Sequence, residues 1–401
     1  MKETKIIFVG YAVNPEESAA YSGISIAGNK MQVNLLKNLY EIKDVDLHII
    51  TIRPVATFPT DKKAFYSSVK EKIFAKTEAE EVGFVNFPIV KQISQIRSVE
   101  KAIKAALKQY GTEHTILLTF NMFPQVGIPA VRAMKKYGVK MVSLLADLPI
   151  DDAASRSIFG RFLRSRFDES TRRSIRMLEH AIVLNKYAAE RYAPCADYIV
   201  IDGGVDEDTI AKFHPAFTAE KKKTRNMVYG GSLNSYSGVI TLAKSMRHIP
   251  DEDIILEIYG AGDGEKELKQ IAQMDQRIRI HGRVDNTVML QKQREAYLLV
   301  NPRPIDDPIS EVTFPSKIFE YMLSGTPVLS TRLNGFSDEY NGKILFFEGQ
   351  DEEAMASSIV NVMRMPHAQL NGYARRAYEY ISSEKGWTKQ AERIYEYCKK
   401  I

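Results

Sequence analysis

The residues best suited to chemistry lie in the segment Phe314 to Pro327. Pro315 is typical of the first position of a helix, where the leading backbone amides have no partner inside the helix. The amides left free would be those of Ser316, Lys317 and Ile318. Free amides and the helix dipole attract an anion, and the lysine adds a positive charge. Glu320 follows one turn later and could accept hydrogen bonds from two hydroxyls, as a ribose offers, so the segment predicts a site for a phosphate beside a sugar.

Alternating strands and helices must position that segment. Short apolar runs typical of buried parallel strands recur in both halves, at 5–10, 46–52, 115–120, 140–145, 180–184, 226–229, 254–259, 278–281, 296–300, 327–331 and 343–347. The helical stretches between them imply crossover connections and parallel sheets. We expect an α/β fold with two Rossmann-like, doubly wound domains facing each other across a cleft, because such sheets bind ligands beyond the carboxyl ends of their strands.

The 401 residues suit two domains. We expect an N-terminal domain over residues 1–212 and a C-terminal domain over residues 225–384. The stretch 213–224 carries proline and a run of lysines, which indicates a linker. Residues 385–401 form a C-terminal helix that is a candidate to pack back on the N-terminal domain. Trp387, the only tryptophan, is interpreted as a packing anchor there.

The segment around Glu320 resembles the donor-site helix of family 4 retaining glycosyltransferases, which have the GT-B fold. That family has two glutamates separated by seven residues, with Phe-Gly after the first. Phe314 and Pro315 match Phe-Gly, and Glu320 matches the second glutamate, which holds the ribose hydroxyls. The first glutamate would fall at Val312, and Glu311 stands one residue earlier. Two interpretations stay open: a one-residue bulge brings Glu311 into place, or the sugar is held differently.

Residues 229–239 resemble the family's strand, loop and helix at the start of the nucleotide-sugar-binding domain. The family places an arginine and a lysine on the donor diphosphate there, and this chain has Ser232 and Ser237 instead. Hydroxyls can hydrogen-bond a phosphate but supply no charge. Arg303 and Lys317 are the candidates for the missing positive charge, and a solvated or structural role is the alternative for Arg303.

Other loops of both domains resemble the family's donor site. Residues 280–284 resemble the loop that holds the nucleobase by stacking and by backbone hydrogen bonds. Residues 22–30 resemble the glycine-rich loop that approaches the donor phosphates and sugar, although a purely structural turn is the alternative. The further donor-binding residues implied by the resemblance are Gly28, Asn29, Gly231, Arg283 and Val284.

Two polar residues follow strands of the N-terminal domain, which the resemblance makes the acceptor side. Asn121 follows Phe120 and Asp147 follows Ala146, whereas the histidine often found in the family is absent. Asp147 would either orient an acceptor hydroxyl or cap the Asp-Leu-Pro turn, and both interpretations stay open. The predicted catalytic set is Glu311, Lys317, Arg303 and Asp147. No acidic pair stands out as a metal site, so we expect no metal.

A basic segment raises the question of membrane contact. Residues 155–177 hold seven arginines among apolar residues at helical spacing. Such a helix can lie on anionic lipid, and an ordinary surface helix is the alternative. No stretch approaches the ~20 apolar residues that span a bilayer. With only two cysteines, Cys195 and Cys398, and no signal-peptide pattern, we expect a cytoplasmic protein, peripheral at the inner face of the membrane if 155–177 binds lipid.

Together the residues and the resemblance predict a metal-independent, retaining glycosyltransferase. It would move a sugar from a nucleotide diphosphate sugar, a UDP-sugar foremost, to a hydroxyl of a glycan or lipid-linked acceptor in cell-surface polysaccharide synthesis. We expect no cofactor beyond this co-substrate and no nucleic-acid partner. The net charge of +5 fits an anionic ligand. The alternatives are a nucleotide-sugar epimerase of the same fold and a non-catalytic nucleotide-sugar-binding protein, the latter suggested by the missing glutamate, arginine and lysine.

Overall fold

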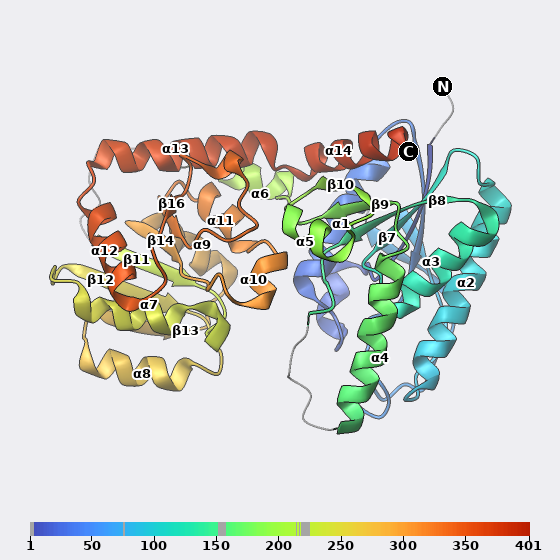
Figure 1. The fold of residues 1–401 in the computed structure, drawn as a ribbon, viewed down its shortest axis with the longest axis horizontal. Helices are drawn as coiled ribbons and strands as arrows, with labels where there is room; N and C mark the ends of the chain where they lie inside the picture. Colours follow the sequence, from blue (N-terminus) through green and yellow to red (C-terminus); the bar gives the residue numbers. More distant parts are fainter. Residues whose placement is uncertain (1–3, 75–76, 151–157, 214, 216, 218–224) are drawn as a thin grey trace. The chain divides into compact units, whose positions relative to one another are not determined.

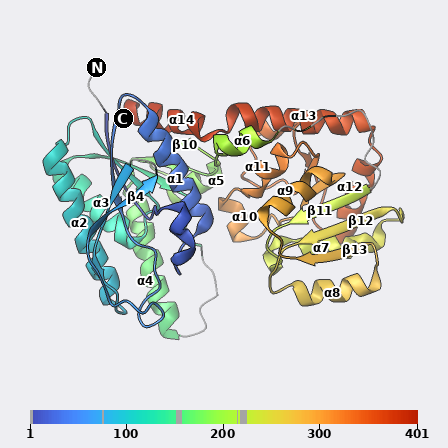
Figure 2. The same ribbon diagram turned by 180° about the vertical axis from the view of Figure 1, so that it is seen from behind.

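The structure is a computed structural model that describes residues 4–74, 77–150, 158–213, 215, 217 and 225–401, without the side chains of residues 19, 20, 158–163 and 235. The chain forms two compact units (Figures 1 and 2). Unit 1 combines Met1–Gly204 with Trp387–Ile401, and unit 2 is Val205–Gly386.

Unit 1 is built on an eight-stranded sheet with the order β10-β9-β8-β7-β1-β2-β5-β4. Its strands are parallel except for β4, which pairs antiparallel with β5. All six residues of the central strand β7 are buried, because helices cover both of its faces. The strands are β1 (Thr4–Gly10), β2 (Val45–Thr51), β4 (Val69–Phe74), β5 (Thr77–Glu81), β7 (Thr115–Phe120), β8 (Lys140–Leu145), β9 (His180–Val183) and β10 (Asp197–Val200). A separate antiparallel pair joins β3 (Phe65–Tyr66) to β6 (Phe84–Val85).

The helices of unit 1 lie on both faces of this sheet. They are the 3-10 helix η1 (Pro15–Ala20), α1 (Ile26–Glu41), α2 (Val90–Tyr110), α3 (Pro124–Tyr137), α4 (Ile158–Ile175), α5 (Lys186–Tyr192) and α14 (Trp387–Lys400). Helices α1 and α14 share one core with the sheet, in which Trp387 is buried against the chain at Gly204. A Cβ at Gly204 would lie 2.9 Å from the indole, so the glycine makes room for this packing.

Unit 2 has a six-stranded parallel sheet with the order β13-β12-β11-β14-β15-β16. The strands are β11 (Arg225–Gly230), β12 (Ile254–Tyr259), β13 (Ile278–Gly282), β14 (Leu298–Asn301), β15 (Val328–Ser330) and β16 (Leu345–Phe346). Successive residues of β11 enter different cores, Met227 on one face and Val228 on the other, as a sheet between two helical layers requires.

The helices of unit 2 form these two layers. They are α6 (Glu207–Lys212), η2 (Ser235–Ser237), α7 (Val239–Ser245), η3 (Met246–His248), α8 (Glu265–Met274), α9 (Asn286–Glu295), α10 (Pro308–Val312), α11 (Lys317–Leu323), η4 (Asp338–Tyr340), α12 (Glu352–Met363) and α13 (His367–Glu384). Helices α7, α8 and α12 contribute to the core that contains Met227, and α11 and α13 to the core that contains Val228.

The division into units differs from the expected boundary at residue 212. Unit 1 ends at Gly204, because Val205 and Phe213 are buried in a core of unit 2. Most of the expected linker, 213–224, lies outside the described residues. Residues 385 and 386 belong to unit 2, and the chain re-enters unit 1 at Trp387.

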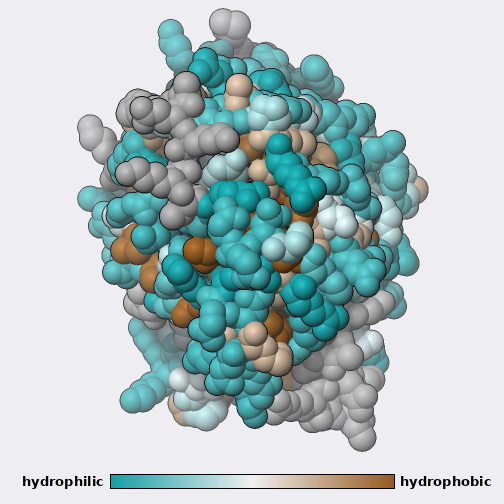
Figure 3. Space-filling model, turned by 90° about the vertical axis from the view of Figure 1, so that its left-hand side faces the viewer, coloured by the Kyte–Doolittle hydropathy of each residue, from teal (hydrophilic) through white to brown (hydrophobic). Residues whose placement is uncertain are grey.

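The described surface offers no membrane-crossing helix, since no described helix combines the necessary length and apolarity. The face drawn in Figure 3 is mostly hydrophilic, with hydrophobic residues in small separate patches. Such scattered apolar residues are ordinary on a folded protein.

Candidate functional site

A pocket of about 390 Å³ in unit 2 lies where β11, β12 and β13 reach their carboxyl ends. Four predicted donor-binding residues line it together: Gly231, Ser232, Arg283 and Val284. Two glycines let its loops approach each other closely. Gly260 has φ +145°, and a Cβ there would lie 1.8 Å from the carbonyl oxygen of Gly231. Any larger residue would therefore open this turn.

Helix α11 is fixed against the same loop by a buried tyrosine. The hydroxyl of Tyr321 accepts from the amide of Gly230 at 2.8 Å and donates to its carbonyl at 3.2 Å. Tyr229, the residue before Gly230 on β11, donates a hydrogen bond from its hydroxyl to the carbonyl of Ser232 at 2.7 Å. These bonds place the first turn of α11 beside the loop that follows β11.

Lys317 therefore reaches the edge of the pocket. Its Nζ lies 4.2 Å from the ring centroid of Tyr229, and a Cβ at Gly231 would be 3.2 Å from it. Although part of the Lys317 side chain has accessible surface, protein atoms surround its ammonium closely. Burial lowers the pKa of Lys317 to about 7, and the positive charge of Arg303 adds to the effect. The lysine is thus poised to gain a proton when an anion arrives.

Arg303 is the second cation of this site. Its Nε donates to the hydroxyl of Ser310 at 2.8 Å, and burial lowers its pKa, with Asp307 acting in the opposite direction. Among the residues that the structure describes, neither Arg303 nor Lys317 forms an ion pair with a carboxylate. Two neighbouring, largely buried cations with no carboxylate in ion-pair contact among the described residues are costly, and a bound dianion would offset that cost.

The start of α11 differs in one detail from the prediction. The helix begins at Lys317, two residues after Pro315, and the amide of Ile318 is not free because it donates to the carbonyl of Pro315 at 2.9 Å. The amides of Ser316 and Lys317 donate to no described residue. Ser316 itself is exposed, whereas the side chain of Ile318 is fully buried in the core.

The two glutamates lie on separate short helices. Glu320 is half-buried on α11, and Glu311 is half-buried on α10. Val312, where the resemblance expects a glutamate, is buried in the core of unit 2. Asp307 caps α10 by accepting from the amides of Ile309 and Ser310, and the helix holds Val312 inward and Glu311 at the surface.

The two serines at the places of the family's arginine and lysine differ in the structure. Ser232 is exposed and lines the pocket. Ser237 is buried, and its hydroxyl donates to the carbonyl of Asn234 at 2.6 Å. Ser237 does not line the pocket. The hydroxyl of Ser237 thus closes η2, and of the two serines only Ser232 lines the pocket.

Several residues of this pocket were not predicted from the sequence. Tyr259, at the end of β12, lines it and stacks on His281 with centroids 4.4 Å apart and rings 10° from parallel. Asn286 and Met289 enter from α9. Tyr259 could have been found from its place before the Gly260 turn, but α9 carries no sequence signal that marks these two residues.

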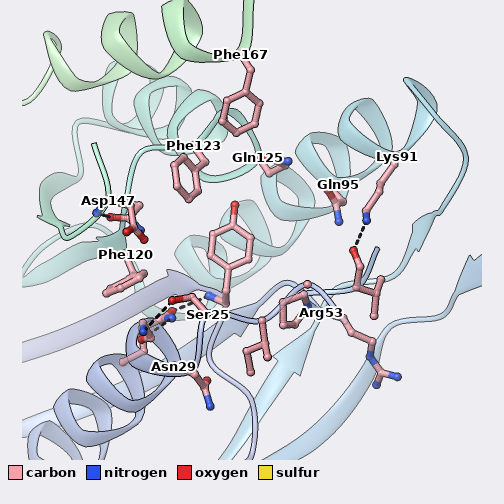
Figure 4. A pocket seen from close by; sticks show the side chains of 18 residues that line it. Ser25, Asn29, Arg53, Lys91, Gln95, Phe120, Phe123, Gln125, Asp147 and Phe167 are labelled. Carbon is pink, nitrogen blue, oxygen red and sulfur yellow. Dashed lines mark hydrogen bonds between the residues drawn. The ribbon is translucent and has the colours of Figure 1, made fainter. Parts of the chain in front are cut away.

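Unit 1 has a second pocket, of about 250 Å³, between the loops after β1, β7 and β8 (Figure 4). Asn121 and Asp147 meet there. Asn121 adopts a left-handed conformation, with φ 59°, and its Oδ1 accepts from the amides of Ala146 and Asp147, both at 2.8 Å. Its Nδ2 donates to Asp147 Oδ2 at 3.1 Å. Asn121 therefore positions the Asp147 carboxyl, which has accessible surface in the pocket and whose pKa is raised by burial, with the Asn121 bond opposing.

Gly28 and Asn29 line this same pocket of unit 1. The amide of Gly28 donates to the hydroxyl of Ser25, which caps α1. The side chain of Asn29 is buried, accepting from the Val13 amide at 2.9 Å and donating to the Val13 carbonyl at 3.1 Å. Asn29 thus holds the loop after β1 in shape, and its amide is occupied by that task.

The membrane interpretation of 155–177 falls partly outside the described residues, because 155–157 and the side chains of 158–163 are not described. Phe167, one of the apolar residues of 155–177, lines the pocket of unit 1 and contacts Phe123 with centroids 5.6 Å apart. Arg172 donates to the carbonyl of Pro149 at 2.9 Å. These described residues serve the fold of unit 1.

Residues 224–365, which cover most of unit 2, match the family described as Glycosyl transferases group 1. The whole chain is similar in fold to solved glycosyltransferases. These include sucrose-phosphate synthase from Thermosynechococcus elongatus (16% identity, 99% of each chain covered, TM-score 0.67) and Anabaena HepE in complex with UDP (14%, 99% of this chain and 100% of that one, 0.64). The lipopolysaccharide outer core galactosyltransferase WaaB is a third (14%, 98% and 99%, 0.64). No curated protein matches the chain.

These likenesses confirm the predicted fold class. The protein has the GT-B fold, with two parallel-sheet units, and its second unit carries the match to group 1 glycosyl transferases. The fold and the family match together support transfer of a sugar from a nucleotide sugar as the class of activity.

Proposed function

We propose that the protein is a retaining, metal-independent glycosyltransferase of family 4 that uses a UDP-sugar as donor and a hydroxyl of a glycan or lipid-linked molecule as acceptor. The observation that carries this proposal is the pair of cations Lys317 and Arg303, which have no carboxylate partner among the described residues and stand beside the pocket of unit 2. A diphosphate is the ligand that such a pair fits best.

The proposed roles of the site residues follow from the place where negative charge develops during sugar transfer. When the bond between sugar and diphosphate breaks, negative charge grows on the leaving nucleotide diphosphate. Lys317, Arg303 and the amides of Ser316 and Lys317 can stabilise that charge without a metal ion. Val284 and Arg283 would hold the base, and Glu320 would accept from the ribose hydroxyls.

The acceptor belongs to unit 1 in this proposal. Asp147, positioned by Asn121, would accept a hydrogen bond from the attacking hydroxyl. In a retaining reaction the acceptor attacks from the face that the leaving group vacates, and the diphosphate itself can take up the proton. UDP as nucleotide is supported by HepE, solved with UDP and with UDP and glucose. Polysaccharide synthesis is supported by WaaB and by WaaG, which is involved in lipopolysaccharide biosynthesis.

The test is a thermal-shift screen with UDP, GDP and dTDP, because a ligand that binds only the native state raises the melting temperature. We expect UDP to give the largest shift and Lys317→Met to reduce it. Lys266→Met, which changes an exposed lysine elsewhere in unit 2, is the matched control and should keep the shift. No shift with any nucleotide would overturn the proposal.

One observation favours a second function, nucleotide-sugar binding without transfer. Val312 fills the place of a family glutamate with a core residue, so that position supplies no carboxylate to the sugar. Hydrolysis or transfer of a UDP-sugar, measured as UDP release over a panel of acceptors, separates the two. Binding without release in every case would favour the binding protein.

A further inference from the structure

We propose that the pocket of unit 1 recognises a neutral sugar ring, with Gln95 and Gln125 binding its hydroxyls and Phe123 and Phe167 packing against its face. That this ring belongs to the acceptor rests on the proposed function. The class of ligand is argued from the pocket alone.

Three polar groups in this pocket have no hydrogen-bond partner among the described residues. Gln95, on α2, is only 3% exposed, and its side-chain carboxamide makes no hydrogen bond with a described residue. Gln125, on α3, has a buried Oε1 that accepts no hydrogen bond from the part of the chain that the structure describes. The hydroxyl of Tyr11 also has no partner among the described residues. Buried polar groups are normally hydrogen-bonded, so their convergence on one pocket indicates a ligand with several hydrogen-bonding groups.

The chemistry of these groups favours hydroxyls. A carboxamide offers both donors and an acceptor, and a hydroxyl both donates and accepts. Asp147, positioned by Asn121, adds a carboxylate that accepts from hydroxyls. Figure 4 shows Gln95, Gln125 and Asp147 arriving from different elements around one space.

The remaining wall is aromatic. Phe123 contacts Phe167 at a centroid distance of 5.6 Å and Tyr11 at 6.2 Å, so three rings from three parts of unit 1 form one continuous surface. A sugar ring has C–H groups on its faces and hydroxyls around its edge. It therefore matches a pocket with aromatic rings on one side and amides and a carboxylate on the others.

The charge of the lining disfavours an anionic ligand. Arg53 is neutralised by Glu81 at 2.6 Å and Glu71 at 3.6 Å. Lys91 donates to the backbone carbonyl of Val55 at 2.6 Å, and the charge of Asp61 acts on it favourably, while Asp147 brings an acidic side chain to the same pocket. This differs from the pocket of unit 2, where two cations stand without a carboxylate partner among the described residues. A phosphate fits unit 2, and an uncharged ring fits unit 1.

The volume limits the ligand to about one ring. At about 250 Å³ the pocket is smaller than the roughly 300–1,000 Å³ typical of sites for drug-sized ligands. Further sugars of a longer glycan would extend beyond it.

The test is saturation-transfer NMR with the full-length protein and the methyl glycosides of glucose, galactose and mannose, compared with glucose 6-phosphate and glucuronate. We expect at least one neutral glycoside to bind and the two anions to bind more weakly. Gln95→Leu, which keeps the volume, should weaken binding about tenfold. Gln109→Leu, an exposed position on the same helix α2, should leave it unchanged.

The outcomes are distinct. No neutral glycoside binding at high millimolar concentration, tighter binding of the anions, or equal binding by the Gln95→Leu variant would each overturn the inference. If Gln95→Leu fails to fold, Gln125→Met gives the same test from α3. UDP binding should be unaffected by either variant, so glycoside binding without UDP binding would refute the proposed function and leave this inference standing.

Discussion

Replacing Lys317 by methionine removes one charge from the donor pocket and keeps the length of the side chain. A hydrogen bond to a charged group contributes about 1.5–3 kcal/mol, which corresponds to about 10- to 150-fold in affinity. We therefore expect Lys317→Met to weaken UDP binding by that factor at pH 6.5, where most of the wild-type lysine is protonated. Isothermal titration calorimetry measures it, with Lys266→Met as the control.

The same variant isolates a pH dependence. Burial lowers the pKa of Lys317 from 10.5 to about 7 in the free protein, and a bound diphosphate would raise it again. Binding above pH 7 therefore requires proton uptake, and the affinity should fall by up to tenfold for each further pH unit. UDP has its own phosphate titration near about pH 6, but the ratio of wild-type to Lys317→Met affinity cancels it. That ratio should be constant below pH 7 and decline above it.

The free energy of unfolding should depend on pH in the opposite direction to the UDP affinity, rising where the affinity falls. The lowering from 10.5 to about 7 corresponds to about 5 kcal/mol of unfavourable charging at about 1.4 kcal/mol for each pH unit. Because the unfolded chain binds the proton more tightly, wild-type stability rises with pH between about 7 and 10.5. Lys317→Met should thus be as stable as the wild type or more stable at pH 7. Unchanged UDP affinity in a folded Lys317→Met variant, with a flat ratio across pH, would refute the reasoning.

Three further changes have definite expected results. Glu320→Ala should weaken UDP binding about tenfold in isothermal titration calorimetry, because hydrogen bonds to the ribose are lost. An unchanged UDP affinity would show that Glu320 is not part of the site. Gly260→Ala should lower the melting temperature in thermal denaturation, since its Cβ would lie 1.8 Å from the Gly231 carbonyl oxygen at φ +145°; a wild-type melting temperature would show that the turn adapts. Trp387→Ala should cost about 3–5 kcal/mol in denaturant unfolding followed by circular dichroism, because the side chain is buried in the core of unit 1, and a smaller loss would mean that α14 contributes little there.

The sheets could be predicted because their strands are continuous apolar runs. The six buried residues of β7 read as one such run, and the parallel order follows from the helices between the strands. The boundary between units could not be predicted in the same way. Val205 and Phe213 look like neighbours of the preceding strand in sequence, and only tertiary packing assigns them to unit 2.

In the two pockets, too, some residues could be predicted from the sequence and others could not. Gly231, Ser232, Arg283 and Val284 were found because they follow predicted strands, whose carboxyl ends meet at one edge of a sheet. Ser237 stays a prediction: its position in the loop resembles that of a phosphate-binding lysine, but its hydroxyl is buried and donates to a backbone carbonyl, which the sequence does not indicate.

Residues that reach a pocket from helices lacked any local signal. Gln95 and Gln125 stand on amphipathic helices as ordinary polar residues, and Phe167 read as part of a basic surface helix. Their role depends on which side of α2, α3 and α4 faces the loops after β1, β7 and β8. Spacing along one helix does not contain that information.

The central claim is that a diphosphate binds beside Lys317 and Arg303 at the start of α11. A crystal structure of the protein with UDP tests it most directly. We predict phosphate oxygens within hydrogen-bond distance of Lys317 Nζ and of the Lys317 amide, with the base between Arg283 and Val284. UDP bound elsewhere, with those groups facing only solvent, would contradict the account.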